Sequence, residues 1–304
     1  MSFFLEPFHY EFMQKALLGC LLVGFTNGYL SGFIVLRRHA LLADGLSHSL
    51  LPGLAVGAIF FGLNPVGLFL GALVAALLVV LGGKMITHSS RLKDDTSIGA
   101  LYIAAFALGI ILLKFAPVRV DLSHFLFGNV LGMANGDLWI TYALSFFIVL
   151  VLTVFHRHLL LTLFDPVVAA SLGLSVAWLD YLLIGMMVMA MIASLQAVGA
   201  VMSIGLLILP AATIYLLSDS YDMMVWGGAF LGMASAVAGL LLSYWVNLPS
   251  GPAIVMVLSA AFVAAYLFGP RYGVINRLLN NRRTKRASAP APDQTGVDLP
   301  PAAL

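Results

Sequence analysis

Long uncharged apolar runs recur along this chain from Phe12 to Tyr266, and they constrain the fold more than any other feature. A helix rises about 1.5 Å per residue, so about 20 apolar residues cross the ~30 Å hydrocarbon core of a bilayer. A membrane β-barrel would need short segments in which apolar and polar residues alternate, whereas these runs are apolar at both parities. The sequence therefore predicts an all-α, polytopic transmembrane helical bundle.

Composition excludes an ordinary soluble domain. Hydrophobic residues make up 62% of the 304 positions and charged residues 9%, against roughly a quarter charged in soluble domains. The chain contains no GxxxxGK[ST] phosphate loop, so an ATP-driven process would need a separate chain for hydrolysis. We expect no enzyme activity, no permanently bound cofactor and no nucleic-acid partner. The single cysteine, Cys20, excludes an intrachain disulfide.

The apolar runs predict about eight or nine spans. Basic connections alternate with charge-poor ones, which places the N-terminus outside, and the basic residues after the last span place the C-terminus in the cytoplasm. The stretch 182–218 is long for one helix and short for two, and a break at Gly199 or Gly205 would divide it. The expected spans are 12–36, 44–62, 65–83, 97–114, 138–155, 176–198, 199–217, 223–246 and 252–268.

The chain divides into two regions of different composition. Residues 1–270 contain all the expected spans and form the transmembrane domain. Residues 271–304 are first basic and then rich in Pro and Ala, without apolar periodicity. Such a segment cannot bury enough surface to fold, so we expect a disordered cytoplasmic tail.

Asp44 and His48 lie four positions apart at the start of the second expected span. This spacing puts both side chains on one helical face. A carboxylate inside a bilayer costs several kcal/mol unless it is paired or hydrated, so Asp44 is a candidate functional residue. Oxygen and imidazole ligands together suit Zn²⁺, Mn²⁺ or Fe²⁺. The structural alternative is that Asp44 caps the helix and His48 hydrogen-bonds a carbonyl oxygen.

Three other features qualify as candidates. Asp121 and His124 are spaced i, i+3 after an external basic stretch, and they form either an outer metal relay or a capped surface helix. In 164–175, Asp165-Pro166 predicts a helix start and Gly173 a stop, giving a short cytoplasmic helix that docks on a partner or lies on the headgroups. Pro210 lies within a span, where it kinks the helix.

Four motifs occur in a fixed order: FIVLRRHALLADGLSHSLLPG, VDLSHFLFGNVLG, FDPVVAASLG and LLILPAAT. With them the chain resembles, from about Phe12 to Gly269, the membrane permeases of bacterial zinc, manganese and iron ABC importers, which are related to the vitamin B12 and siderophore permeases. The resemblance implies a homodimer in the bacterial inner membrane, surrounded by lipid. It also implies two ATP-binding subunits on the cytoplasmic side and an external metal-binding protein.

The resemblance assigns roles to individual residues. It implies that Asp44 and His48 are metal ligands and that 165–173 is the coupling helix. The transported ion would be Mn, Zn or Fe. The implied contacts to the ATPase involve Asp165, Pro166, Ala169, Ala170 and Gly173.

Two rival functions are compatible with the same sequence. A permease for chelated iron or a vitamin would not need ligands in the pore. A proton-coupled secondary metal transporter would need an ionisable relay, for which the spans offer only Asp44, His48 and Asp180. Arg37 and Arg38 lie about 9 Å before Asp44 if the helix is continuous. Either these arginines snorkel outward or the ion is held near the cytoplasmic side.

Overall fold

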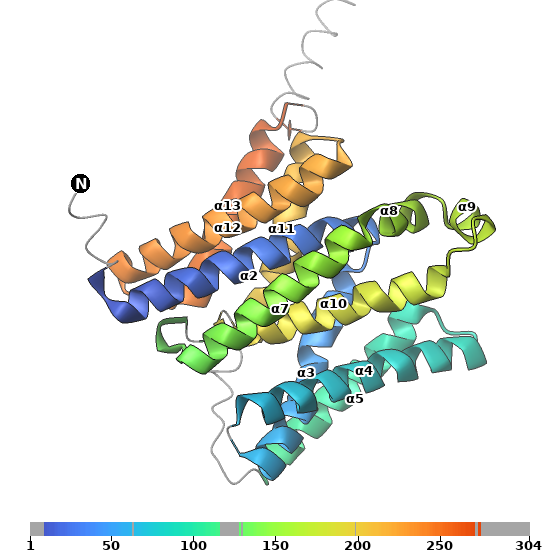
Figure 1. Cartoon of the computed structure of the whole chain (residues 1–304), viewed down its shortest axis with the longest axis horizontal. Helices are drawn as coiled ribbons and strands as arrows, with labels where there is room; N and C mark the ends of the chain where they lie inside the picture. Colours follow the sequence, from blue (N-terminus) through green and yellow to red (C-terminus); the bar gives the residue numbers. More distant parts are fainter. Residues whose placement is uncertain are drawn as a thin grey trace, which may run out of the picture.

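The computed structural model describes residues 9–62, 64–115, 128, 130–197, 199–270 and 273–274. Its regular elements are helices throughout this part of the chain, and they lie side by side in one bundle (Figure 1). The elements are α2 (Glu11–Leu36), α3 (Ala40–Phe61), α4 (Pro65–Ser89), α5 (Asp94–Leu113), η2 (Val130–Gly132), α7 (Asn135–Val154), α8 (His156–Phe164), α9 (Pro166–Ser171), α10 (Val176–Ala197), α11 (Ala200–Leu217), α12 (Tyr221–Val246) and α13 (Ser250–Phe268).

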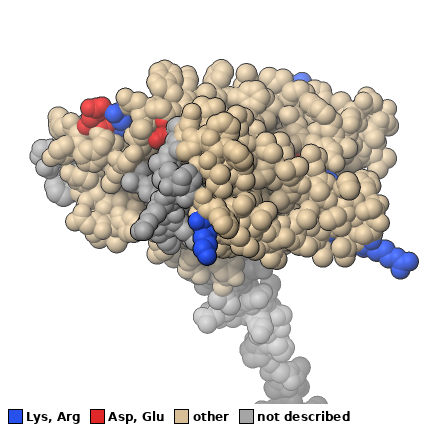
Figure 2. All heavy atoms as spheres, turned by 90° about the horizontal axis from the view of Figure 1, so that it is seen from below, with Lys and Arg blue, Asp and Glu red and all other residues tan. Residues whose placement is uncertain are grey.

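Eight of these helices are long and apolar enough to cross a membrane. A further apolar helical stretch, Ser203–Leu217 of α11, is shorter. The prediction of an all-α bundle with eight or nine spans is therefore confirmed. Figure 2 shows a molecular face with few charged side chains, as expected of a surface that meets lipid.

The structure decides one helix boundary that the sequence left open, and it shows another that the sequence did not predict. The long stretch 182–218 divides at Gly199, whose φ of 86° is accessible to glycine and costly for other residues. Gly205, the other candidate, lies inside α11. The helix α8 was not predicted; a short break at Phe155 separates it from α7.

Glycines join α2 to α12 at very short range. A Cβ added to Gly28 would overlap the carbonyl oxygen of Gly228, and one added to Gly24 would lie 2.7 Å from the carbonyl oxygen of Gly232. Small residues at four-residue spacing let helix backbones approach in this way, and van der Waals contact then holds them. The α2–α12 seam, defined by these four glycines, is consequently a close interface without charged groups.

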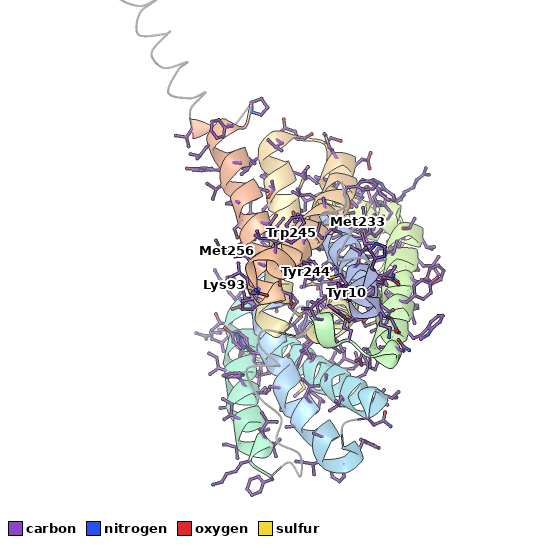
Figure 3. The ribbon with its side chains drawn as sticks, turned by 90° about the vertical axis from the view of Figure 1, so that its left-hand side faces the viewer. Tyr10, Lys93, Met233, Tyr244, Trp245 and Met256 are labelled. Atoms are coloured by element: carbon purple, nitrogen blue, oxygen red, sulfur yellow. The ribbon has the colours of Figure 1, made fainter. Side chains whose placement is uncertain are left out.

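Helices α3, α4 and α5 form a second group, which we call the α3–α5 unit. It lies apart from α12 and α13 in two perpendicular views (Figures 1 and 3). Within the unit, Gly53 of α3 lies against the backbone of Gly71 in α4. Gly109 of α5 approaches the backbone of Pro52 in α3. The unit is therefore tightly packed internally, and α3 carries both candidate metal ligands.

Candidate metal site

Asp44 and His48 lie on the first turns of α3, which begins at Ala40. Both residues are half-buried, while the intervening Gly45, Leu46 and Ser47 are buried. The hydroxyl of Ser47 donates to the backbone carbonyl of Asp44 at 2.7 Å and leaves its carboxylate free. Within the described part of the chain, neither the Asp44 carboxylate nor the His48 imidazole has a hydrogen-bond or ion-pair partner. Both groups are available to a ligand.

Aromatic side chains of α5 hold the imidazole of His48. The Phe106 ring meets it edge to face, with centroids 4.9 Å apart and planes at 68°. The Tyr102 ring lies nearly parallel to it, with centroids 6.3 Å apart. Such contacts fix the ring plane without using its nitrogen atoms. Neither aromatic residue was predicted as part of the site, although their i, i+4 spacing on an apolar run places them on one face.

Asp44 opens onto a small cavity of about 120 Å³ between α3 and α5. Asp95, an exposed residue in the first turn of α5, lies on the other side of this cavity. An acidic residue at a helix start is ordinary, so nothing in the local pattern distinguished Asp95 as a site residue. The remaining lining residues are Leu41, Leu42, Ile98, Gly99 and Tyr102.

One chain supplies an incomplete ligand set. In the described ranges no group of three or more His, Cys, Asp or Glu side chains is close enough to hold a metal ion. Transition-metal sites in proteins use four or more ligands. The predicted outer pair, Asp121 and His124, lies outside the described residues, as does most of the predicted tail 271–304.

The segment predicted as a coupling helix forms the separate helix α9. Asp165 caps it, because its carboxylate accepts a 2.9 Å hydrogen bond from the Val168 amide, and Pro166 occupies the first turn. Ala169 is buried, whereas Ala170 is exposed. Gly173, with φ of 81°, ends the helix as predicted.

Pro210 lies inside α11, as the sequence predicted. The adjacent Ala211 amide donates to the Ser31 hydroxyl of α2 at 3.2 Å. The helix continues through this position to Leu217, and α2 supplies a polar partner beside the proline. A proline is tolerated in a membrane helix when neighbouring helices provide such partners.

Asp180 is not a free relay carboxylate. Its Oδ2 lies 2.6 Å from the Nζ atom of Lys84, and its Oδ1 lies 3.8 Å from Nη2 of Arg37. Arg37 therefore points toward α10, and a turn at Arg38, with φ of 59°, separates it from α3. The distance of about 9 Å between the arginines and Asp44, which assumed one continuous helix, therefore does not apply.

His39, between α2 and α3, is close to the same charges. Burial is the main factor that lowers the pKa of its imidazole, and the nearby Arg37 and Lys84 lower it further. Asp180 and Asp95 act in the opposite direction. The Nδ1 atom of His39 is buried without a hydrogen-bond partner. The neutral form of His39 is therefore favoured in the folded protein.

The sequence profile of the ABC 3 transport family matches residues 9–269, which is nearly all of the described chain. This chain belongs to the ABC 3 transport family. Two curated relatives cover it almost completely. The manganese transport system membrane protein MntC of Halalkalibacterium halodurans is 39% identical, over 94% of this chain and 97% of that protein. A probable iron transport system membrane protein of Haemophilus influenzae is 32% identical, over 91% of this chain and 97% of that protein.

Solved structures agree with the ABC 3 assignment. PsaBC from Streptococcus pneumoniae, in complex with Fab, contains a chain similar to this one with a TM-score of 0.82 and 33% identity. The match covers 92% of this chain and 99% of that chain. An inward-facing putative metal-chelate type ABC transporter shares the fold with a TM-score of 0.66 at 18% identity. The resemblance inferred from the four motifs is confirmed, and this chain is a multi-pass membrane transport protein.

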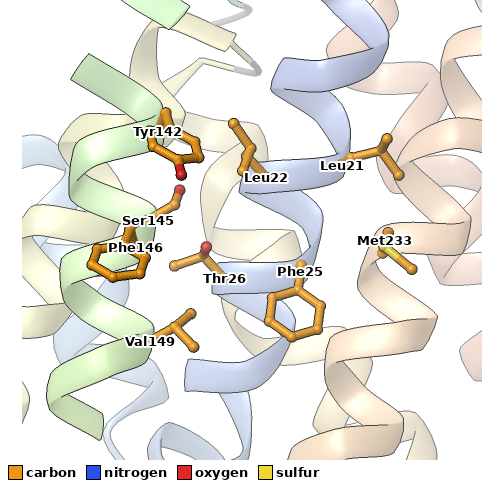
Figure 4. A pocket seen from close by; sticks show the side chains of 9 residues that line it. All are labelled: Leu21, Leu22, Phe25, Thr26, Tyr142, Ser145, Phe146, Val149 and Met233. Atoms are coloured by element: carbon orange, nitrogen blue, oxygen red, sulfur yellow. The ribbon is translucent and has the colours of Figure 1, made fainter. Parts of the chain in front are cut away.

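A larger hollow in this ABC 3 protein lies away from the candidate ligands. An apolar groove of about 330 Å³ runs between α2 and α7 and reaches Met233 of α12 (Figure 4). Its polar lining is limited to Thr26, Tyr142 and Ser145. No carboxylate, imidazole or thiol lines this groove, so it offers no metal ligand of the kinds found on α3.

Proposed function

We propose that this chain is the membrane-spanning subunit of an ATP-driven importer of divalent transition-metal ions. The observation that carries the proposal is the pair Asp44 and His48, which share one face of α3 and have no polar partner in the described part of the chain. Leaving two such groups half-buried without partners is costly unless a ligand uses them. Manganese is the first candidate ion because relatives such as MntC are named for it, and iron and zinc remain compatible with the ligands.

The ligand chemistry is simple. The carboxylate of Asp44 supplies oxygen, and the neutral imidazole of His48 supplies nitrogen through a ring that Tyr102 and Phe106 orient. A second copy of the chain would add the same two residues and complete four ligands at a two-fold axis. The function therefore requires a homodimer. When the ion binds, these ligands replace part of its hydration shell. When the ligands of the two copies separate, water replaces them and the ion is released.

The energy for transport comes from a partner in this proposal, because the sequence has no phosphate loop. The helix α9 offers a docking surface: Val167 is 77% exposed and Leu172 and Phe164 are each 67% exposed. A short helix with exposed apolar side chains fits a groove on an ATP-binding subunit. This interpretation places α9 and the C-terminus on the cytoplasmic side of the bacterial inner membrane. An external binding protein delivers the ion, and Asp121 and His124 remain the predicted outer relay.

The alternative cargo is chelated iron or a vitamin. The cavity beside Asp44 measures about 120 Å³ in a single chain. It is too small for such a cargo, because sites for organic ligands usually measure about 300–1,000 Å³. The proton-coupled alternative loses support as well, because Asp180 is already neutralised by Lys84.

Uptake of radioactive Mn²⁺ by cells or proteoliposomes that contain the full importer tests the proposal. We expect His48→Ala and Asp44→Asn each to lower uptake by about tenfold or more. The exposed His88 provides the matched control, and His88→Ala should retain wild-type uptake. Unchanged metal uptake in both ligand variants, at normal abundance in the membrane, would refute the ligand assignment.

A further inference from the structure

Three partly buried charged side chains meet where α2, α4 and α10 approach one another at the α9 end of the bundle, and the more exposed Asp94 of α5 lies 3.8 Å from the Nζ atom of Lys84. The carboxylate of Asp180 on α10 bonds to Lys84 of α4 at 2.6 Å and lies 3.8 Å from Arg37, which caps α2. The side chains are only 16–19% exposed. Lys84 also lies over the ring of Tyr181, with 5.2 Å from Nζ to the ring centroid. We call Arg37, Lys84 and Asp180 the charge link.

The charge link ends an apolar stripe on α4 and borders another on α10. On α4, the buried residues Ala72, Ala76 and Val80 recur every four positions, and Lys84 is the next member of this series. On α10, Asp180 lies beside a buried face that includes Leu179, Leu183 and Ile184. A half-buried ion pair at this place adds little net stability over an apolar pair, but it imposes one register and one set of partners.

The charge link connects α10, which follows α9, to the helices that lead into the candidate metal site. Asp180 lies on the first turns of α10, which begins shortly after α9 ends. Lys84 belongs to the α3–α5 unit. Arg37 begins the short turn that leads into α3 and its two candidate ligands. One carboxylate therefore joins the helix that follows α9 to both routes into the metal site.

We propose that Asp180 is a positioning residue that passes a displacement of α9 to the α3–α5 unit, so that the unit moves with the N-terminal end of α10. This inference rests on the proposed function, in which a partner ATPase moves α9. Between α10 and α4 the charge link is a directional contact, unlike the apolar packing of the core residues around it.

The first experiment measures manganese imported per ATP hydrolysed by the reconstituted importer with its ATPase and binding protein. We expect Asp180→Asn to lower this ratio by about tenfold, the factor that corresponds to one charge-assisted hydrogen bond, with ATP hydrolysis changed less than about twofold. Asp222 is the matched control, because this carboxylate lies at the same end of the bundle but is 79% exposed. Asp222→Asn should leave the ratio unchanged, and Lys84→Arg should retain most of it. An unchanged ratio in Asp180→Asn would overturn the proposal.

A second variant separates positioning from simple loss of stability. In a Cys20→Ala background, Lys84→Cys/Asp180→Cys removes two charges and allows a reversible bis-methanethiosulfonate cross-link between α4 and α10. We expect the uncross-linked protein to be uncoupled, cross-linking to restore import per ATP, and reductant to abolish it again. Import that is coupled before cross-linking, or not restored by cross-linking, would overturn the proposal.

A readout that does not depend on cargo distinguishes this inference from the proposed function. Spin labels at Phe60→Cys of α3 and Phe230→Cys of α12, both exposed positions, report the placement of the α3–α5 unit. ATP with vanadate should change their separation in the complex with wild-type Asp180 and not with Asp180→Asn. An equal change in both proteins overturns the charge link, whereas a wild-type complex that changes shape but imports no manganese overturns only the proposed cargo.

Discussion

The α2–α12 seam and the α4–α10 boundary are two helix interfaces of one bundle, and they are built differently. Glycines bring the backbones of α2 and α12 into contact without any charge. At the other interface, helices α4 and α10 are joined by an ion pair between Lys84 and Asp180. Backbone contact tolerates no added atom, whereas an ion pair depends on the charge of two side chains and can be removed without steric conflict. The difference indicates a fixed frame around α2 and α12, and a boundary beside the α3–α5 unit whose alignment depends on one ion pair.

The largest effect is expected at the fixed frame. Gly28→Leu places a side chain where the Gly228 carbonyl lies, and overpacking against backbone should cost about 3 kcal/mol. We expect the purified protein to lose its single peak in detergent size-exclusion chromatography. Gly185→Leu is the matched control, because nothing lies within 4 Å of a Cβ at Gly185. Equal stability of the two variants would remove the distinction between the seam and an open helix face.

A smaller effect is expected inside the α3–α5 unit. Phe106→Ala removes the edge-to-face contact on His48, and such contacts contribute about 0.5–1.5 kcal/mol, or roughly twofold to tenfold in metal affinity. Titration of the purified importer with Mn²⁺, or the KM for uptake, measures the change. Ile103→Ala on the same helix is the control, since Ile103 is 61% exposed. An unchanged KM in Phe106→Ala would show that His48 needs no aromatic support.

Acid should weaken the boundary beside the charge link. The folded protein holds the pKa of His39 below its ordinary value of 6.5, so the unfolded chain binds this proton first. Stability from neutral His39 is therefore complete above about pH 6.5 and is lost as the pH falls through the lower folded value. Thermal unfolding between about pH 7.5 and 5 measures this loss. His39→Gln should flatten the profile, and an identical profile in both proteins would contradict the assignment.

The smallest effect is expected at the N-terminal end of α2. Lys15 and Glu11 form another ion pair of 2.6 Å, but the Glu11 side chain is 80% exposed. Solvent screens such pairs strongly. We expect Lys15→Gln to leave both the melting temperature and import per ATP unchanged, in contrast to variants of Lys84. If Lys15→Gln lowered import per ATP as much as the Lys84 variants do, import would respond to the loss of any lysine, and the case for the charge link would be weaker.

Local spacing accounts for the features that were predicted correctly. Apolar run lengths indicated the membrane helices, and Asp165-Pro166 with Gly173 marked both ends of α9. The four-residue spacing of Asp44 and His48 is enough by itself to place them on one helical face. The contacts of these residues were not predictable in the same way. Lys84 and Asp180 are 96 positions apart, and only the packing of α4 against α10 brings them together.

The break at Phe155 and the choice of Gly199 over Gly205 had a different origin. Both glycines fit a break in an uncharged stretch equally well by composition. The decision depends on backbone geometry, because Gly199 adopts a positive φ while Gly205 packs against Val255 inside α11. Helix α8 was not predicted because no glycine or proline marks the break at Phe155.

The turn at 37–39 joins α2 to α3 close to the candidate metal site. Asp44 lies four residues into α3, about 6 Å from its start, whereas Phe61 lies about 32 Å away at 1.5 Å per residue. If α3 tilts about this turn, Asp44 travels about a fifth as far as the distant end of the helix. His48, about 12 Å from the start of α3, would travel about two-fifths as far. Both candidate ligands would therefore move less than the distant end of α3, so a large change in access at that end needs a smaller change in coordination.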